Sequence, residues 1–209
     1  MKILLVDDHA LVRAGLQRLL TDDIEAASFG EAASSAEALD CVRREPWDIV
    51  LLDLSLPGRS GLETVKDIHA LRSDLPILVM TMYAEDQYAV RAFRAGAAGY
   101  ITKGSSPDEL VAAVRKVSAG GRFLTLSAAE TLANGLGSRD QSSAHASLSD
   151  RELQVLRMLG TGKTVGEIGA ELSLSAKTVS TYRARILEKL EMRTTAQLVH
   201  YCVIANLVD

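Results

Sequence analysis

Residues 49–61 read IVLLDLSLPGRSG, and this stretch decides the fold. The apolar run Ile49–Leu52 is typical of a strand that is buried on both faces of a parallel sheet. Asp53 ends the run, and Pro57-Gly58 suits the turn that follows, because proline fixes φ and glycine permits backbone angles that other residues avoid. A helical pattern then begins. The stretch therefore predicts a strand–turn–helix unit with a carboxylate at the carboxyl end of its strand.

The same strand–helix pattern runs through the first 120 residues. The predicted strands are 3–6, 26–29, 49–52, 77–80 and 99–101, and the predicted helices are 10–20, 34–44, 61–72, 86–94 and 107–119. Such alternation predicts an α/β domain with a parallel sheet that is covered by helices on both faces. Ligands of these sheets lie beyond the carboxyl ends of the strands. Polar residues just past the strand ends are therefore the candidate site.

Five polar residues meet this condition: Asp7, Asp8, Asp53, Thr81 and Lys103. Three carboxylates at one edge repel each other unless a cation lies among them, and an oxygen-rich site of this kind suits Mg²⁺. We expect Asp53 to be the nucleophile, because an aspartate can form a covalent acyl phosphate. Lys103 would pair with one phosphoryl oxygen, and the Thr81 hydroxyl would hydrogen-bond another. Taken singly, an aspartate at a strand end is more often only a helix cap or a turn residue, and Asp8 could be that alone.

The composition allows two globular domains. The chain has 209 residues, of which 47% are hydrophobic and 24% are charged. Its formal net charge of −4 argues by itself against a nucleic-acid-binding protein. However, residues 148–209 carry eight Lys and Arg against seven Asp and Glu, so the acidity belongs to residues 1–147. The overall charge therefore says little about the second half.

Neither a disulfide framework nor a membrane segment is expected. The two cysteines, Cys41 and Cys202, lie far apart in apolar helical patterns and are interpreted as small buried hydrophobic residues. The apolar run after the N-terminal MK is too short for a signal peptide, and no stretch approaches the roughly 18 apolar residues of a membrane span. We therefore expect a cytoplasmic protein with no membrane partner.

The pattern changes after Gly120-Gly121. Residues 121–147 are predicted to be a linker with room for a short helix at 124–136, because the stretch GLGSRDQSSAHAS is rich in Gly, Ser and Ala. Helical periodicity resumes at Leu148 without a strand signal. The four helices expected there are 149–160, 164–172, 175–190 and 195–206. They predict a small all-α domain over residues 148–209.

The second and third of these helices form a predicted helix-turn-helix, with a tight connection at Ser173-Leu174-Ser175. On the helix that follows the connection, Val179, Ile186 and Leu190 fall on one face and would pack inward. The other faces carry the predicted DNA contacts, which are Lys177, Thr178, Ser180, Thr181, Ala184, Arg185 and Lys189. A solvated amphipathic helix is the alternative interpretation of this pattern.

The motifs LLVDDH, IVLLDLSLPGRSG, ILVMTMY and GAAGYITK resemble, in order and spacing, the receiver domain of two-component response regulators. The resemblance covers about residues 1–120. It implies a flavodoxin-like (βα)5 fold, a Mg²⁺ ion held by Asp8 and Asp53 with the Ser55 carbonyl, and Asp53 as the residue that accepts a phosphoryl group from a sensor histidine kinase.

Thr81 and Tyr100 resemble the switch pair of that family. The resemblance implies that the hydroxyl moves toward the phosphate and that the aromatic ring follows it inward. Tyr83, two residues beyond Thr81, could overhang the phosphoryl group and hinder attacking water. This placement leads to the hypothesis of slow autodephosphorylation.

The run from LSDRELQ to RTTAQL resembles the LuxR-type helix-turn-helix domain throughout, and the two domains together look like the NarL/FixJ subfamily. Two residues depart from the family pattern: Val165 replaces a commonly polar residue, and Gly169 stands where alanine is usual. Gly169 is expected to cost its helix up to about 1 kcal/mol relative to alanine.

The last predicted helix carries an apolar stripe that includes Leu198, Cys202 and Val203. Part of such a stripe could be the core of its own domain. In the subfamily the last helix usually pairs with its twin on DNA, so Leu198 and Cys202 are predicted to be dimerisation residues. A homodimer would read two half-sites about one helical turn apart.

These observations together predict a transcription regulator that binds double-stranded promoter DNA when Asp53 is phosphorylated. It would be no enzyme beyond catalysing its own phosphorylation and dephosphorylation. A second hypothesis is an adaptor that works through protein contacts, with a vestigial DNA-binding domain. A third, a metal-dependent phosphatase, is weaker because no general base is apparent near Asp53, although His9 lies close in sequence.

Overall fold

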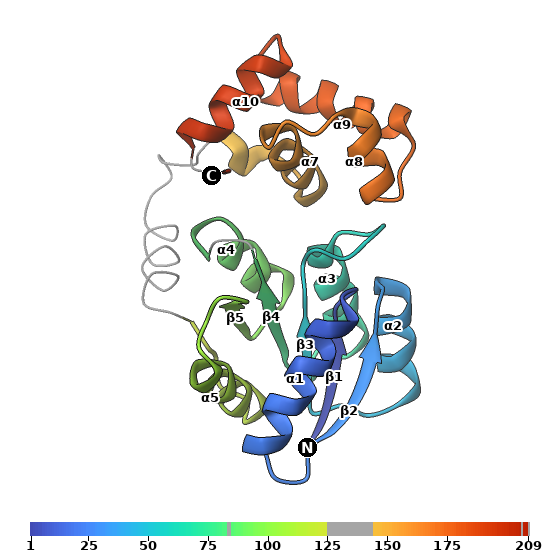
Figure 1. Cartoon of the computed structure of the whole chain (residues 1–209), viewed down its shortest axis with the longest axis vertical. Helices are drawn as coiled ribbons and strands as arrows, with labels where there is room; N and C mark the ends of the chain where they lie inside the picture. Colours follow the sequence, from blue (N-terminus) through green and yellow to red (C-terminus); the bar gives the residue numbers. More distant parts are fainter. Residues whose placement is uncertain (83–84, 125–143, 206, 209) are drawn as a thin grey trace. The chain divides into compact units, whose positions relative to one another are not determined.

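The chain divides into two compact units, Met1–Leu136 and Gly137–Asp209 (Figure 1). The computed structural model describes residues 1–82, 85–124, 144–205 and 207–208. The division falls inside the predicted linker, residues 121–147. No helix in these described ranges is long and apolar enough to cross a membrane.

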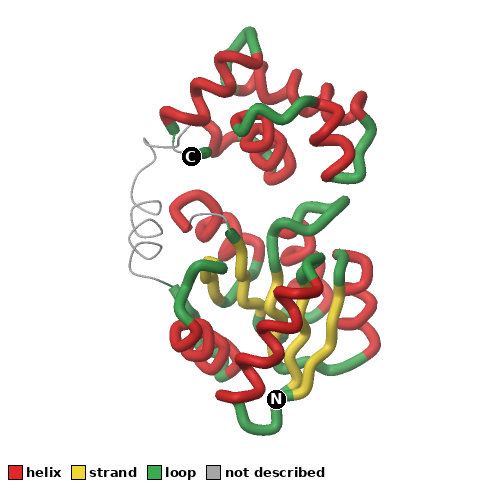
Figure 2. Tube along the Cα trace, viewed as in Figure 1, coloured by secondary structure: helices red, strands yellow, loops and turns green. Residues whose placement is uncertain are grey.

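The first unit is a parallel five-stranded sheet with the strand order β2-β1-β3-β4-β5 (Figure 2). The strands are β1 (Lys2–Val6), β2 (Ser28–Ala32), β3 (Ile49–Leu52), β4 (Ile77–Thr81) and β5 (Gly99–Thr102). The helices are α1 (Ala10–Asp23), α2 (Ser35–Arg44), α3 (Gly61–Leu71), α4 (Glu85–Ala95) and α5 (Pro107–Ser118). The predicted flavodoxin-like (βα)5 fold is confirmed.

Helices cover both faces of the sheet, as the continuous apolar strands require. Helices α1 and α5 lie on one face, and α2, α3 and α4 lie on the other (Figure 1). Successive strand residues point to opposite faces. On the face of α1 and α5, Ile3 and Leu5 therefore join a buried cluster with Leu20 and Val114. The sheet is thus held from both sides, and its carboxyl edge is fixed in place.

The second strand lies later in the chain than predicted: β2 begins at Ser28 and not at residue 26. Ala26 has a positive φ of 54° and accepts a hydrogen bond from the N-terminal amine at 3.1 Å, so the chain turns there. Strand β2 is at the edge of the sheet and only partly buried, with an exposed Glu31. Strand β2 has no continuous apolar run to mark its ends, and the pairing of Lys2 with Ser28 sets its register instead.

The second unit is helical over the residues that the structure describes. It contains a short 3-10 helix, η1 (Ala144–Ser147), followed by α7 (Asp150–Gly160), α8 (Val165–Glu171), α9 (Ala176–Lys189) and α10 (Thr195–Ile204). Ser149, Thr164 and Thr194 begin α7, α8 and α10 with capping boxes, which explains the sharp helix starts. The four helices predicted after Leu148 are all present.

Both ends of the predicted linker contact the unit beside them. The Tyr100 amide donates to the Phe123 carbonyl at 3.2 Å, so the chain after Gly121 still pairs with β5. At the other end, His145 of η1 hydrogen-bonds the Tyr201 hydroxyl of α10 through Nδ1, at 2.8 Å. The short helix predicted at 124–136 lies outside the described residues apart from its first position.

Replacing Gly61 by alanine is expected to destabilise the first unit. A Cβ there would lie 2.3 Å from the Cα of Leu54, and overpacking against a backbone costs roughly 1–3 kcal/mol. Gly15→Ala is the matched control: nothing lies within 4 Å of its added Cβ, so this helix position should gain roughly 0.5–1 kcal/mol. Urea unfolding followed by the fluorescence of Trp47, the only tryptophan, reports on this unit. Effects of equal sign would contradict the packing argument.

Candidate functional site

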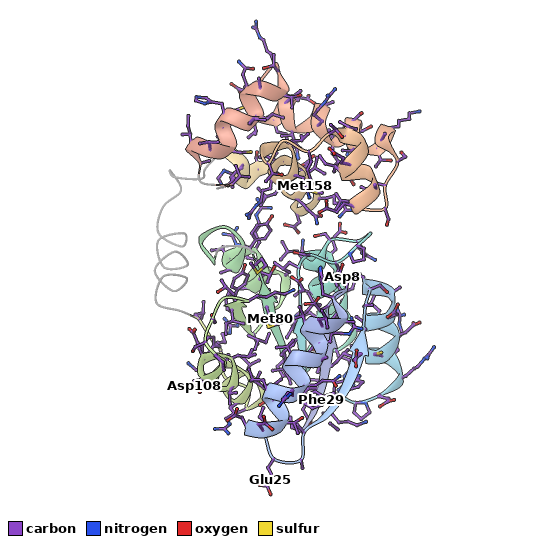
Figure 3. All side chains as sticks on the ribbon, in the orientation of Figure 1. Asp8, Glu25, Phe29, Met80, Asp108 and Met158 are labelled. Atoms are coloured by element: carbon purple, nitrogen blue, oxygen red, sulfur yellow. The ribbon has the colours of Figure 1, made fainter. Side chains whose placement is uncertain are left out.

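The strand order brings the predicted site residues to one edge of the first unit. Asp7 follows β1, Asp53 follows β3, Thr81 ends β4, and Lys103 follows β5. Strands β1, β3, β4 and β5 are consecutive neighbours and parallel, so their carboxyl ends share an edge. Figure 3 shows Asp8 at this edge, at the opposite end of the sheet from Glu25.

Lys103 joins two of the predicted carboxylates. Its Nζ lies 2.6 Å from Asp7 Oδ2 and 2.7 Å from Asp53 Oδ2. The side chains of Asp7 and Asp53 are each 2% exposed, and that of Lys103 is 13% exposed. Burial by itself would lower the pKa of Lys103, but the hydrogen bonds to Asp53 and Asp7 outweigh it and raise that pKa. The ammonium therefore stays charged at neutral pH and compensates the two buried carboxylates.

The site residues lie just past the ends of their strands, but backbone hydrogen bonds to neighbouring strands still hold them in place. The amides of Asp7 and Asp53 donate to the carbonyls of Ala32 and Val6, at 3.1 and 2.9 Å. The Lys103 amide donates to the Thr81 carbonyl at 2.8 Å. The sheet ladder thus extends into the site and fixes the positions of its functional groups.

Two residues, Arg13 and His9, make contacts at the site that could not be anticipated from the sequence. Arg13 of α1 donates from Nη1 to the Asp7 carbonyl at 2.6 Å, and its Nε pairs with Glu31 at 2.6 Å. His9 Nδ1 lies 2.8 Å from Asp8 Oδ1 and 3.3 Å from Asp7 Oδ1. The VDDHALVR segment carries these residues at helix-forming spacing, but nothing in it indicates a partner on β2.

The acidic edge has the donor set for a divalent cation. Ligand atoms of Asp7, Asp8 and His9 all lie within 4.8 Å of one another. Asp53 lies beside these ligand atoms, because the Lys103 ammonium that contacts Asp7 also contacts Asp53. The Oδ1 atom of Asp53 accepts a hydrogen bond from the Ser55 amide at 3.1 Å. Carboxylate oxygens are the ligands that Mg²⁺ prefers. The receiver family binds Mg²⁺ at this acidic pocket in general, and the residues present fit such an ion.

Thr81 and Tyr100 share a face of the sheet. Val79 is the register partner of Tyr100, and Thr81 lies two residues after Val79, so all three side chains point the same way. Tyr100 and Thr81 are both fully buried. The Thr81 hydroxyl has no hydrogen-bond partner among the described residues, which is unusual for a buried polar group and fits a donor reserved for a ligand. Tyr83, named above for its position, lies outside those residues.

In the second unit, α8 and α9 form the predicted helix-turn-helix. The turn between them passes through Ser173, whose φ is 53°. A Cβ at position 169 would lie 2.8 Å from the Leu174 carbonyl oxygen. Gly169 therefore lets the turn pack closely against α8, and this contact opposes the gain in helix propensity that alanine would bring.

Helix α9 is oriented as its sequence predicts. Val179 and Ile186 are fully buried, and Leu190 just after the helix is nearly so. Six of the predicted DNA contacts are exposed or half-exposed and lie outside the buried face: Lys177, Thr178, Ser180, Thr181, Ala184 and Arg185. Among the predicted DNA contacts, Lys189 differs, because its Nζ lies 2.6 Å from Oε2 of a buried glutamate, Glu152.

The predicted dimerisation residues of α10 require a correction. Leu198 and Cys202 are both 0% exposed and belong to the core of their own unit. The Cys202 thiol donates to the Leu156 carbonyl at 3.5 Å, and burial raises its pKa to about 11. The exposed large apolar residues of this helix are Val203, which belongs to the predicted stripe, and Ile204, at 56% and 68% exposure.

Comparison with known proteins matches both units. Residues 3–115 match the family described as "Response regulator receiver domain", and residues 146–202 match "Bacterial regulatory proteins, luxR family". Response regulator UvrY of Escherichia coli K12 is 39% identical over 96% of this chain and 93% of its own length. Response regulator GacA of Pseudomonas aeruginosa is 38% identical over 100% and 98% of the two chains. A solved complex of the response regulator RcsB with DNA is 26% identical, with a TM-score of 0.58 over 97% of this chain and 98% of RcsB.

Replacing Lys103 by methionine is expected to destabilise the first unit by roughly 3 kcal/mol at pH 7, because it leaves buried carboxylates without their cation. Added Mg²⁺, which supplies another cation, should reduce this loss. Urea unfolding followed by Trp47 fluorescence measures the loss with and without Mg²⁺. Arg43→Met, which removes an exposed pair with Asp40, is the control and should change little. A loss that is independent of Mg²⁺ would rule out the charge-compensation role.

Proposed function

Since the chain belongs to the NarL/FixJ-type response regulators, in which a receiver domain is joined to a LuxR-type DNA-binding domain, we propose that phosphorylation of Asp53 controls its binding to DNA. The protein is a transcription regulator and not a classical enzyme. The observation that carries the proposal is the pair of short contacts from Lys103 to Asp53 and Asp7. The DNA-binding and receiver activities follow from the family, whereas the residues that perform them are proposed here.

The phosphoryl donor is the phosphohistidine of a sensor histidine kinase. An oxygen of the Asp53 carboxylate forms a bond to phosphorus while the bond between phosphorus and the imidazole nitrogen breaks. Lys103 already contacts Oδ2 of Asp53, so it is placed to pair with a phosphoryl oxygen attached there. The buried Thr81 hydroxyl donates a hydrogen bond to another.

A Mg²⁺ ion would be held by the carboxylates of Asp7, Asp8 and Asp53 with the Ser55 carbonyl. When bound, it would neutralise the charge that collects as the phosphoryl group meets the carboxylates. The protein side chains mainly position the reacting groups and neutralise their charge, so the proposed step needs no general base.

Phosphorylation is communicated through Thr81 and Tyr100. The two side chains lie on one face of the sheet, on the neighbouring strands β4 and β5. A hydrogen bond from Thr81 to the phosphoryl group stabilises one arrangement of these strand ends, and the packing of the Tyr100 ring follows it. The phosphoryl group therefore shifts an equilibrium between two states of the protein.

The DNA-binding surface is the outer side of α9. Lys177 and Arg185 supply cations, and Ser180, Thr181 and Ala184 are small enough to let the helix approach the base edges in the major groove. Thr178 is the sixth residue of this surface, although its hydroxyl also contacts the Ser175 hydroxyl at 2.8 Å. Dimerisation takes place through the exposed residues Val203 and Ile204 of α10.

An adaptor that acts only through protein contacts is the competing function. The near balance of cations and anions in residues 148–209 favours it, because DNA-binding domains usually carry a basic excess. The two functions differ in their response to salt: real phosphate contacts make DNA affinity fall steeply as salt rises.

The first test measures affinity for promoter fragments by fluorescence anisotropy, with and without beryllofluoride and Mg²⁺. Treatment should tighten binding by the wild type by about 5- to 150-fold, the usual range of coupling between two sites. It should not affect Asp53→Ala, which lacks the acceptor carboxylate. A response that survives in Asp53→Ala would exclude Asp53 as the acceptor. Binding to no fragment at all would favour the adaptor.

The second test concerns the dimer. Val203→Asp places a charge on the exposed apolar side of α10 and should weaken binding to a two-half-site fragment by about tenfold or more, because the avidity of the dimer is lost. Binding to a single half-site should be unchanged. Leu71→Asp, an equally charged change at an exposed apolar residue of α3, is the control. Equal losses on both fragments would mean that Val203 does not act through dimerisation.

A further inference from the structure

We propose that Lys189 positions the recognition helix α9 through an ion pair with Glu152 and does not bind a DNA phosphate. The inference rests on the proposed function of α9 as the helix that enters the major groove. In this proposal, the cation at the end of α9 stabilises the packing of the domain and does not contact DNA.

The ammonium of Lys189 already has oxygen partners within its own unit. Its Nζ lies 2.6 Å from Glu152 Oε2 and 3.5 Å from the Ser147 carbonyl oxygen. The Glu152 side chain is 4% exposed, whereas that of Lys189 is 39% exposed. The lysine thus reaches inward from a surface helix to a buried carboxylate. Turning it toward DNA would leave that carboxylate buried without its cation, which is unfavourable.

Glu152 is in turn fixed by the first turn of α7. Its Oε2 atom, the same atom that pairs with Lys189, accepts the Ser149 amide at 2.7 Å. Its own amide donates to Ser149 Oγ at 3.3 Å, which completes the capping box. Burial by itself would raise the pKa of Glu152, but the hydrogen bonds from Lys189 and Ser149 outweigh it and lower that pKa. The carboxylate is therefore charged at neutral pH and rigidly placed.

The pair ties the end of α9 to the beginning of α7. Lys189 is the last residue of α9, and Val179 and Ile186 anchor the buried face of the helix before it. Apolar contacts allow small rotations and shifts along a helix axis, whereas a short ion pair to a fixed carboxylate restricts both. A cation at this end also complements the partial negative charge of the helix carboxyl terminus. The pair therefore sets the angle at which Lys177 and Arg185 meet DNA.

The experiment measures the affinity of the full chain for a promoter fragment, in the presence of beryllofluoride and Mg²⁺, over a range of salt concentrations. The variants are Lys189→Met, Lys189→Arg, Glu152→Gln and the double variant Lys189→Met with Glu152→Gln. Glutamine retains an oxygen that accepts the Ser149 amide, so Glu152→Gln removes the charge but keeps the helix cap. Lys177→Met serves as the reference for a true DNA contact, and far-UV circular dichroism verifies that each variant is folded.

If Lys189 is a positioning residue, Lys189→Met should weaken binding by about tenfold, a size usual for residues within one salt-bridge network. The slope of log affinity against log salt should not change, because no phosphate contact is lost. Glu152→Gln should weaken binding to a similar extent although Glu152 is buried. The double variant should be no weaker than either single variant, and Lys189→Arg should restore most of the affinity.

Other results would overturn the proposal. A slope that is shallower by about 0.9 in Lys189→Met, as expected for Lys177→Met, would mean that Lys189 binds a phosphate. Unchanged affinity in both Lys189→Met and Glu152→Gln would mean that the pair has only a structural role. Glu171→Gln, which removes the carboxylate of an exposed pair with Lys163, is the matched control and should not weaken binding. If the wild type itself bound no DNA, the proposed function would fail, and this result is distinct from all the others.

Discussion

Two charged carboxylates that are shielded from water repel each other strongly unless a cation lies between or beside them. Asp7 and Asp53 are in this situation because β1 and β3 are neighbours in a parallel sheet and both residues come just after their strands. Lys103 resolves it from the end of β5, with Nζ within 2.7 Å of both side chains. The strand order, the apolar layers on both faces and the backbone bond from Lys103 to Thr81 all serve to hold this arrangement.

The same charge balance makes the site responsive. A phosphoryl group on Asp53 adds negative charge where Lys103 already compensates two carboxylates, so the surrounding groups must rearrange or recruit another cation. The Thr81 hydroxyl is buried without a partner among the described residues, and Tyr100 lies on the same face of the neighbouring strand. In the proposed mechanism, a phosphoryl group on Asp53 would act on the ends of β4 and β5 through Thr81 and Lys103.

The sequence predicted the central strands and the site edge well, because a strand buried on both faces must be continuously apolar and its first polar residue marks its end. The sequence was less informative where the interaction partner of a residue lies far away along the chain. The bounds of β2 depend on its pairing with Lys2. The apolar stripe of α10 does not indicate which of its residues face inward, so Leu198 and Cys202 were predicted at a dimer interface although they are buried in their own unit. The ion pair between Lys189 and Glu152 could not be foreseen either, because Glu152 lies 37 residues earlier in the chain. Such pairings arise only from tertiary packing.

The residues proposed to act in phosphorylation lie at the carboxyl edge of the sheet in the first unit, and connections between helices and strands lie at the opposite edge. Glu25 is exposed in the connection between α1 and β2 at that edge (Figure 3), and Asp74 is exposed in the connection between α3 and β4. Insertions are best tolerated at exposed connections of this kind, away from buried backbone hydrogen bonds. A reporter or a second domain inserted at these connections should therefore leave the proposed phosphorylation site undisturbed. The fold is thus suited to the design of fused signalling proteins.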